Sequence, residues 1–122
     1  MCLLSGNYAG FLDKRKKLII ICTNNAKKRE GYTLLRKRNK DSHERIALHI
    51  KKSLRHEAVH LAQECNNGNL LKTDKKLSMN LSKINALNGS IKISGEEEKE
   101  RQAYILEDKP RLVKNKLIKY CL

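Results

Sequence analysis

Residues 56–60 read His-Glu-Ala-Val-His, an HExxH motif whose residue types suit metal-assisted hydrolysis. On a helix, His56 and His60 lie one turn apart on the same face, so both imidazoles can reach a single zinc ion. Glu57 lies at the edge of that face, where its carboxylate can take a proton from a metal-activated water. The motif therefore predicts a zinc site with Glu57 as the general base of peptide hydrolysis.

The surrounding residues predict that the motif lies in the C-terminal half of a long helix, residues 42–65. Asp41 and Glu44 have the spacing of an N-terminal capping box, and Asn-Asn-Gly at 66–68 is typical of a helix end. Apolar residues recur upstream at the spacing of a buried helical stripe: Ile46, Ala47, Ile50 and Leu54. A helical HExxH is thus the expected arrangement.

A catalytic zinc ion is usually held by three protein ligands, so a third ligand must be found. Glu64 continues the spacing of the two histidines, but it lies eight residues beyond His56, about 12 Å along a helix axis. Metal–ligand bonds are only about 2 Å long, which places Glu64 out of reach. The third ligand is therefore expected from another element.

A second helix with suitable acidic residues is predicted before Pro110. Ser94 and Glu97 have the spacing of a capping box at its start. One face of this helix combines two carboxylates, a small residue and an aromatic ring, at Glu100, Ala103, Tyr104 and Glu107. Such a face can pack closely on another helix and direct a carboxylate into the contact. Glu100 and Glu107 both remain open as the third ligand at this point.

The HExxH motif together with Glu-Arg-Gln-Ala-Tyr at residues 100–104 resembles the gluzincin class of zinc metallopeptidases. Many compact gluzincins have HExxH on one helix and a motif like E-x-x-A-(Y/N) on the next. The resemblance implies that zinc is held by His56, His60 and Glu100, with Glu57 as the base. A tyrosine such as Tyr104 is more often a packing residue, and the alternative roles are to orient Glu100 or to polarise the scissile carbonyl in catalysis.

Two smaller families are similar in layout. One is the phage-repressor-cleaving ImmA type, in which HExxH precedes a helix with a pattern like E-x-Q-A-N. The other is the mitochondrial inner-membrane metalloprotease that processes an ATP synthase subunit, whose apolar strand before the HExxH helix is similar to residues 18–22 followed by Asn24. Gln102 is a departure from many other members of the class, which have a second acid at this position.

The predicted fold is α+β: a small zincin-like domain in which a short N-terminal β-hairpin or sheet packs on the long HExxH helix and the Glu-bearing helix. A single domain is expected over residues 1–122, because a chain of this length can form one core but not two. The further elements are two strands at 8–12 and 17–22, a short strand or loop in the basic segment 23–40, a helix between 72 and 87 closed by Asn88-Gly89, and a strand or helix at 112–122.

Several remaining features bear on location and redox state. The sequence contains no run of about 20 apolar residues, and its start lacks a convincing signal peptide, so a cytoplasmic location without membrane association is expected. The four cysteines, Cys2, Cys22, Cys65 and Cys121, are scattered without a C-x-x-C pair. They are therefore expected to be reduced and mostly buried thiols.

A net charge of +14 supports a rival hypothesis, a small basic protein that binds nucleic acid. Against it, the sequence has no recognisable nucleic-acid-binding motif, and only 4% of its residues are aromatic and able to stack on bases. A third hypothesis is a zinc-binding but catalytically inactive regulator. The favoured prediction is a zinc-dependent metallopeptidase that acts on peptides or proteins, with its charge mostly on a solvated surface.

Overall fold

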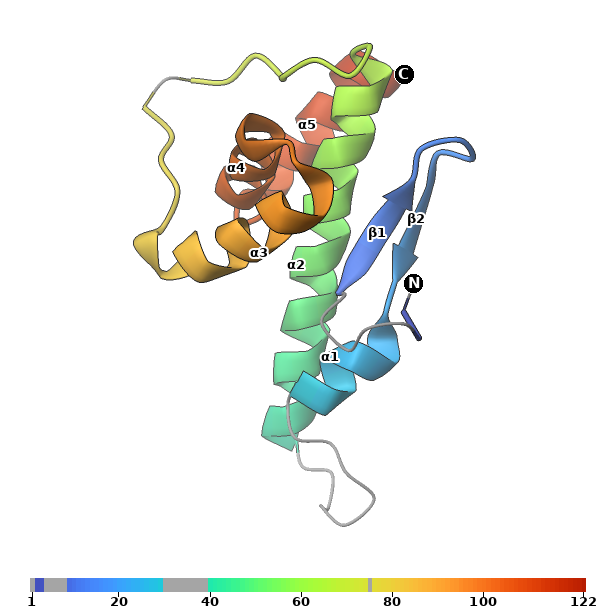
Figure 1. Cartoon of the computed structure of the whole chain (residues 1–122), viewed down its shortest axis with the longest axis vertical. Coiled ribbons are helices and arrows are strands. Elements are labelled where there is room, and N and C mark those ends of the chain that lie inside the picture. Colours follow the sequence, from blue (N-terminus) through green and yellow to red (C-terminus); the bar gives the residue numbers. More distant parts are fainter. Residues whose placement is uncertain (1, 4–8, 30–39, 75) are drawn as a thin grey trace. The chain divides into compact units, whose positions relative to one another are not determined.

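The computed structural model describes residues 2–3, 9–29, 40–74 and 76–122. These residues form an α+β fold with one two-stranded antiparallel sheet and five α-helices (Figure 1). The chain divides into two compact units, residues 1–54 and 55–122, and the longest helix belongs partly to each. Among the described helices, none has both the length and the apolar character needed to cross a membrane.

The first unit contains the predicted hairpin. Strand β1 (Gly10–Asp13) pairs with strand β2 (Leu18–Ile21) in an antiparallel register that places Phe11 opposite Ile20. The turn is stabilised by Asp13, whose carboxylate accepts hydrogen bonds from the backbone N–H groups of Arg15 and Lys16. The two predicted strands are confirmed, whereas their packing on the metal helix stays a prediction.

The segment after the hairpin differs from the expected strand or loop. Residues Thr23–Arg29 form a short helix, α1, which begins directly after Cys22. The backbone N–H of Ala26 donates to the carbonyl of Cys22 and closes the first turn. The rest of that segment, including Tyr32, Leu34 and Leu35, lies outside the described residues up to Asn39.

The HExxH helix is confirmed as α2 (Lys40–Cys65). It ends where the sequence predicts, because Asn67 and Gly68 both adopt left-handed backbone angles, with φ of +60° and +77°. The N–H of Gly68 then donates to the carbonyl of Gln63 over 2.8 Å, which satisfies a carbonyl at the helix end. At the other end, the side chain of the predicted cap, Asp41, lies outside the described residues.

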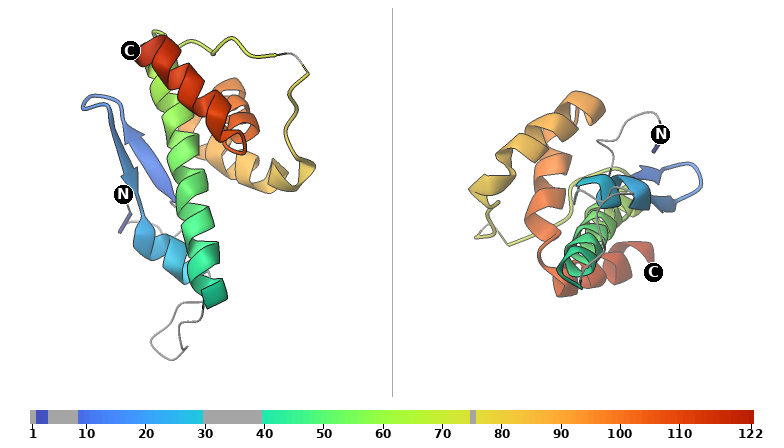
Figure 2. Two further views of the ribbon diagram at one scale, coloured as in Figure 1. Left: turned by 180° about the vertical axis from the view of Figure 1, so that it is seen from behind. Right: turned by 90° about the horizontal axis from the view of Figure 1, so that it is seen from below.

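The second unit contains the C-terminal part of α2 and three further α-helices (Figures 1 and 2). A 3-10 turn at Leu81–Lys83 leads into α3 (Ile84–Ser94), which packs on α4 (Glu97–Leu106), and α4 contacts α5 (Pro110–Cys121). The predicted tail element is thus a helix, and Pro110 begins it, as its fixed φ and missing N–H allow.

Two predicted helix boundaries in this unit are wrong. The helix expected to close at Asn88-Gly89 instead starts at Ile84, continues through both residues and ends at Gly95, whose φ of +72° is the left-handed conformation. Consequently Ser94 is the last residue of α3 and does not cap α4. Its hydroxyl accepts a hydrogen bond from the N–H of Glu96 over 3.2 Å.

The core of this unit contains two alanines. Ala62 of α2 and Ala103 of α4 are completely buried, and so is Leu106. The rest of the apolar core comes from every part of the unit: Ala58, Val59, Leu71, Leu87 and Val113. Gln63 of α2 donates hydrogen bonds to the Gln102 side chain and the Lys99 carbonyl of α4, which connects the motif helix to the Glu-bearing helix.

The expectation of reduced cysteines is wrong for all four. Cys2 forms a disulfide with Cys22 in the first unit, and Cys65 forms one with Cys121 in the second. The partners are 20 and 56 residues apart, so their proximity depends on the fold and not on a local motif. The second disulfide joins the C-terminal end of α2 to that of α5.

We predict that the Cys65→Ser/Cys121→Ser double variant loses about 2 to 4 kcal/mol in free energy of unfolding, because its unfolded chain is no longer closed into a long loop. Urea denaturation measures the change. Thiol titration of the unfolded wild type should detect thiols only after reduction. Four reactive thiols without reductant would contradict both disulfides.

Candidate metal centre

The two motif histidines and Glu100 converge on one point between α2 and α4. The Nε2 atoms of His56 and His60 lie 3.2 Å apart. Oε2 of Glu100 lies 3.1 Å from the first of these nitrogens and 3.4 Å from the second. Among the described residues, these three side chains form the group that could hold a metal ion. The pair predicted from the motif and the carboxylate predicted from the second helix are therefore adjacent.

The spacing of these three atoms fits a tetrahedral metal ion. With zinc–nitrogen and zinc–oxygen bonds of about 2.0 to 2.1 Å, tetrahedral geometry sets ligand atoms roughly 3.3 to 3.4 Å apart. The observed separations are 3.1, 3.2 and 3.4 Å. Two nitrogens and one oxygen are also the ligand types found in catalytic zinc sites with three protein ligands. The residues present thus fit a zinc ion in both chemistry and distance.

The other nitrogen of each imidazole already has an oxygen partner. Nδ1 of His56 lies 2.9 Å from Oε2 of Glu107, and Nδ1 of His60 lies 2.9 Å from Oε1 of Gln63. A carboxylate only accepts, so Nδ1 of His56 must carry hydrogen. When this ring is neutral, its Nε2 presents a lone pair to the point of convergence. A proton or a metal ion at that point relieves the repulsion between the facing lone pairs.

Glu107 contacts Nδ1 of His56, whereas Glu100 contacts Nε2, the nitrogen that faces His60. Of the two carboxylates, Glu100 is therefore the one placed to be a metal ligand. Its second oxygen accepts a hydrogen bond from Nζ of Lys83 over 2.8 Å. Lys83 and Glu107 are only 8% and 6% exposed, so this is a buried ion pair. Lys83 also donates to the carbonyl of Tyr104 and pairs with Asp108. Arg55 donates to the backbone carbonyl of Glu107.

The proton affinities of His56 and Glu100 reflect this crowding. Burial alone would lower the pKa of His56, but hydrogen bonds with the carboxylates of Glu100 and Glu107 raise it to about 9. Burial would raise the pKa of Glu100, whereas its hydrogen bonds with His56 and His60 hold that pKa well below the usual range. Without a metal ion, the centre therefore retains a proton and a carboxylate at neutral pH.

Glu57 lies close enough to the centre for the ligands to influence its charge. Burial raises the pKa of its carboxyl group, while positive charge on His56 and His60 opposes the rise. A raised pKa brings a carboxylate closer to the working range of a general base. The predicted role of Glu57 stays a prediction, and its electrostatic surroundings are compatible with it.

The structure shows a packing role for Tyr104. Its ring meets the ring of His56 edge-on, with centroids 4.4 Å apart. Its hydroxyl is directed toward α3, where it lies 2.7 Å from the Ser90 hydroxyl and donates to the Ala86 carbonyl over 3.2 Å. Polarisation of a substrate carbonyl by Tyr104 stays a prediction to which this geometry adds no support.

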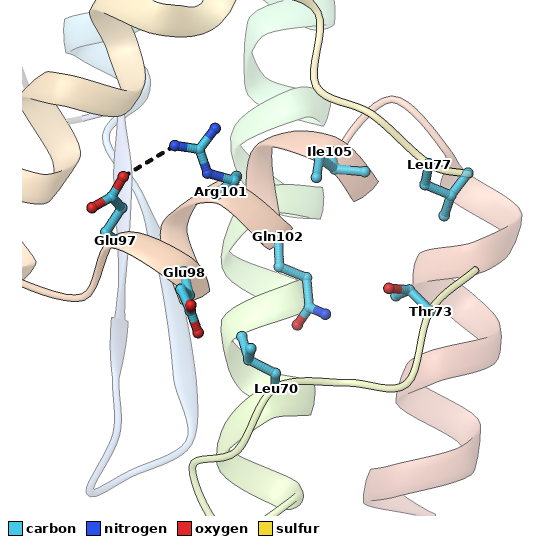
Figure 3. A pocket seen from close by; sticks show the side chains of 8 residues that line it. All are labelled: Leu70, Thr73, Leu77, Glu97, Glu98, Arg101, Gln102 and Ile105. Carbon is cyan, nitrogen blue, oxygen red and sulfur yellow. Dashed lines mark hydrogen bonds and ion pairs between the residues drawn. The ribbon is translucent and has the colours of Figure 1, made fainter. Parts of the chain in front are cut away.

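A separate cavity of about 460 Å³ is lined by residues of α4 other than Glu100 and by residues of the loop after α2. Figure 3 shows the ion pair of Glu97 and Arg101 on one side of it and the Gln102 amide in its middle. Its lining is a mixture of polar and apolar side chains: Leu70, Thr73, Leu77, Glu97, Glu98, Arg101, Gln102 and Ile105. None of the predicted site residues lines this cavity.

Sequence reasoning missed the residues that surround the ligands. Gln63 had a readable signal, because it lies three residues after His60 on the same helix and can contact it. The contact between Lys83 and Glu107 had no such signal, because the two residues are 24 positions apart and form no local pattern. The sequence alternatives for the third ligand included Glu107, and its position beside His56 was outside what spacing could predict.

We predict that Lys83→Met reduces the free energy of unfolding by about 3 kcal/mol or more, because one oxygen of the buried Glu107 carboxylate loses its cationic partner. Urea denaturation at neutral pH measures this. The matched control is Lys99→Met, which removes a solvent-accessible ion pair with Glu96 of similar length, 2.9 Å, and should cost less than about 1 kcal/mol. Equal losses in the two variants would contradict the buried pair.

We also predict that chelator-treated protein loses stability as the pH rises from about 6.5 to 9. The pKa of His56 is about 9 in the folded protein, above its ordinary value of 6.5. Its stabilising contribution is therefore complete below 6.5 and disappears as the pH passes 9. Urea midpoints across this range measure the effect. His56→Gln should show a smaller fall, and an identical fall would disprove the assignment.

Comparison with known proteins connects this centre to a family without an assigned function. No curated protein and no solved structure matches the chain. One family model matches residues 1–122, the whole of the sequence, and its description is "Domain of unknown function (DUF8637)". The chain with this His-His-Glu cluster is therefore a member of the DUF8637 family.

Proposed function

We propose that this protein is a zinc-dependent metallopeptidase with a compact, zincin-like centre. The observation that carries the proposal is the convergence of His56 Nε2, His60 Nε2 and Glu100 Oε2 at separations of 3.1 to 3.4 Å. These separations match a tetrahedral zinc ion. Glu57, beside the first ligand in the HExxH motif, supplies the acid–base group that peptide hydrolysis needs.

Each residue has a distinct task in this proposal. When bound, a zinc ion supplies Lewis-acid chemistry and makes water more acidic. His56, His60 and Glu100 hold the ion, and Glu107 orients His56 through Nδ1. Glu57 takes the proton from the water that attacks the peptide carbonyl and delivers it to the leaving nitrogen. Tyr104 packs against His56 and limits the movement of its ring.

The resemblance to compact gluzincins agrees with this assignment. In that class the first Glu of an E-x-x-A-(Y/N) motif is the third ligand, and Glu100 occupies the matching position here. A single zincin-like domain over residues 1–122 is part of the proposal. So is a peptide or protein substrate, because HExxH with a third carboxylate suits hydrolysis of an amide bond.

The decisive experiment compares zinc content and cleavage in four proteins. Wild type should bind one zinc ion, and His56→Ala and Glu100→Ala should lose it. Glu57→Gln should keep zinc and lose roughly a hundred- to ten-thousandfold in cleavage rate, because only the proton transfer is removed. Elemental analysis measures zinc, and mass spectrometry of a mixture of unstructured peptides detects the products.

Two further variants serve as controls for the carboxylates. Glu98→Ala removes an exposed acid of the same helix and should change neither zinc content nor cleavage. Glu107→Gln should retain zinc with about 10- to 100-fold lower affinity, since it disturbs the orientation of His56 and leaves all three ligands. Full zinc retention in Glu100→Ala would overturn the third-ligand assignment. Absence of zinc in wild type would overturn the metallopeptidase proposal.

The alternatives give other outcomes in the same assays. Zinc binding without cleavage of any peptide would favour a catalytically inactive regulator. A salt-sensitive RNA complex formed equally well after chelation would favour nucleic-acid binding. The distribution of charge makes this assay worthwhile: residues 1–54 contain 14 Lys and Arg against 4 acidic residues, a net charge of +10. Residues 55–122, which contain the metal centre, have 13 against 9, a net charge of +4.

The cytoplasmic location expected from the sequence remains a prediction, and the disulfides bear on it. Persistent disulfides are typical of oxidising compartments, while cytosolic thiols are kept reduced. Alkylation of free thiols at the moment of cell lysis distinguishes the two kinds of compartment. If Cys65 and Cys121 escape alkylation because they are disulfide-bonded, the protein is in an oxidising compartment. If both are alkylated, the result agrees with the cytoplasm.

A further inference from the structure

Two glutamines connect the backbone of the loop after α2 to the second zinc ligand. Gln63 Oε1 lies 2.9 Å from Nδ1 of His60, and Gln63 Nε2 donates to Oε1 of Gln102 over 3.0 Å. Gln102 in turn pairs with both backbone groups of Leu71: it donates to the carbonyl over 2.8 Å and accepts from the N–H over 3.0 Å. Both glutamines are at most 9% exposed.

The direction of every hydrogen bond in this chain follows from its end at Leu71. A backbone N–H can only donate and a carbonyl can only accept, so the Gln102 amide has one permitted orientation. Its oxygen then faces Gln63, which must present its nitrogen. A second acceptor, the carbonyl of Lys99 at 3.3 Å, also requires that nitrogen. Gln63 consequently directs its oxygen toward His60.

This polarity determines which nitrogen of His60 carries hydrogen. An amide oxygen opposite a bare Nδ1 would bring two lone pairs to 2.9 Å, so Nδ1 must carry hydrogen and donate to Gln63. Nε2 of the neutral ring is then bare, and it faces Nε2 of His56 at 3.2 Å. That is the tautomer which a metal ion requires when it binds through Nε2.

We propose that Gln63 and Gln102 are positioning residues that fix the Nδ1–H tautomer of His60 and so prepare Nε2 for the metal ion. The inference rests on the metal site proposed above. It assigns to the loop backbone at Leu71, through two buried amides, the role that a carboxylate has for His56. Without these amides, the hydrogen would move to Nε2 of His60. That nitrogen would then donate a hydrogen bond to the Glu100 carboxylate oxygen, which lies 3.4 Å away.

The test measures the tautomer directly in zinc-free protein. Long-range proton–nitrogen NMR spectra of chelator-treated protein, at about pH 8 where an ordinary histidine is neutral, distinguish a protonated from a bare ring nitrogen. Wild-type His60 should carry hydrogen on Nδ1. Gln63→Met and Gln102→Met should shift the hydrogen toward Nε2 and weaken zinc binding by about 10- to 100-fold.

One control separates tautomer control from general loosening. Asn66→Ala loosens the same loop, because Asn66 donates to the carbonyl of Leu70 over 3.0 Å, but it does not contact the amide chain. It should retain the tautomer. If Gln63→Met does not fold, the comparison of Gln102→Met with Asn66→Ala decides.

The inference and the proposed function fail in different ways. A wild-type His60 with hydrogen on Nε2, or a tautomer unchanged in both Met variants, would overturn the inference even if zinc binds. A wild type that binds no zinc would overturn the metal site, and the tautomer measured in the same sample would still decide whether the glutamines set the hydrogen position.

Discussion

Two imidazole nitrogens that face each other at 3.2 Å, with a carboxylate oxygen beside both, impose the central constraint on residues 55–122. Three acceptors in contact repel each other unless a positive charge lies among them. The fold keeps them together by occupying the outer nitrogen of each ring.

The two histidines are stabilised by different chemistry. His56 has a charged chain, Lys83 to Glu107 to Nδ1, in which every member is buried. His60 has a neutral chain of amides that ends on the main chain. A charged partner makes a nitrogen more basic, whereas an amide mainly orients it. The centre therefore combines one strongly basic histidine with one that is oriented without added charge.

The sequence predicted the elements better than the environment of the site. HExxH and the Asn-Asn-Gly stop at 66–68 identified α2 almost to the residue, because both are local signals. Glu100 was found through the second helix, although its actual start differs from the predicted capping box. The disulfides and the contact of Lys83 with Glu107 could not be predicted, because they join residues 20 to 56 apart that only the tertiary fold brings together.

The dependence of His60 on Leu71 has a consequence for how this site can change over evolutionary time. The groups that Leu71 contributes to the amide chain are its backbone N–H and carbonyl, which every residue except proline possesses. Its side chain, 4% exposed, is constrained only by the space it fills. Other apolar residues can therefore replace Leu71 while its backbone keeps the hydrogen bonds that orient Gln102, and through Gln63 orient His60. Proline would remove the N–H from this chain and leave the carbonyl alone to orient the Gln102 amide.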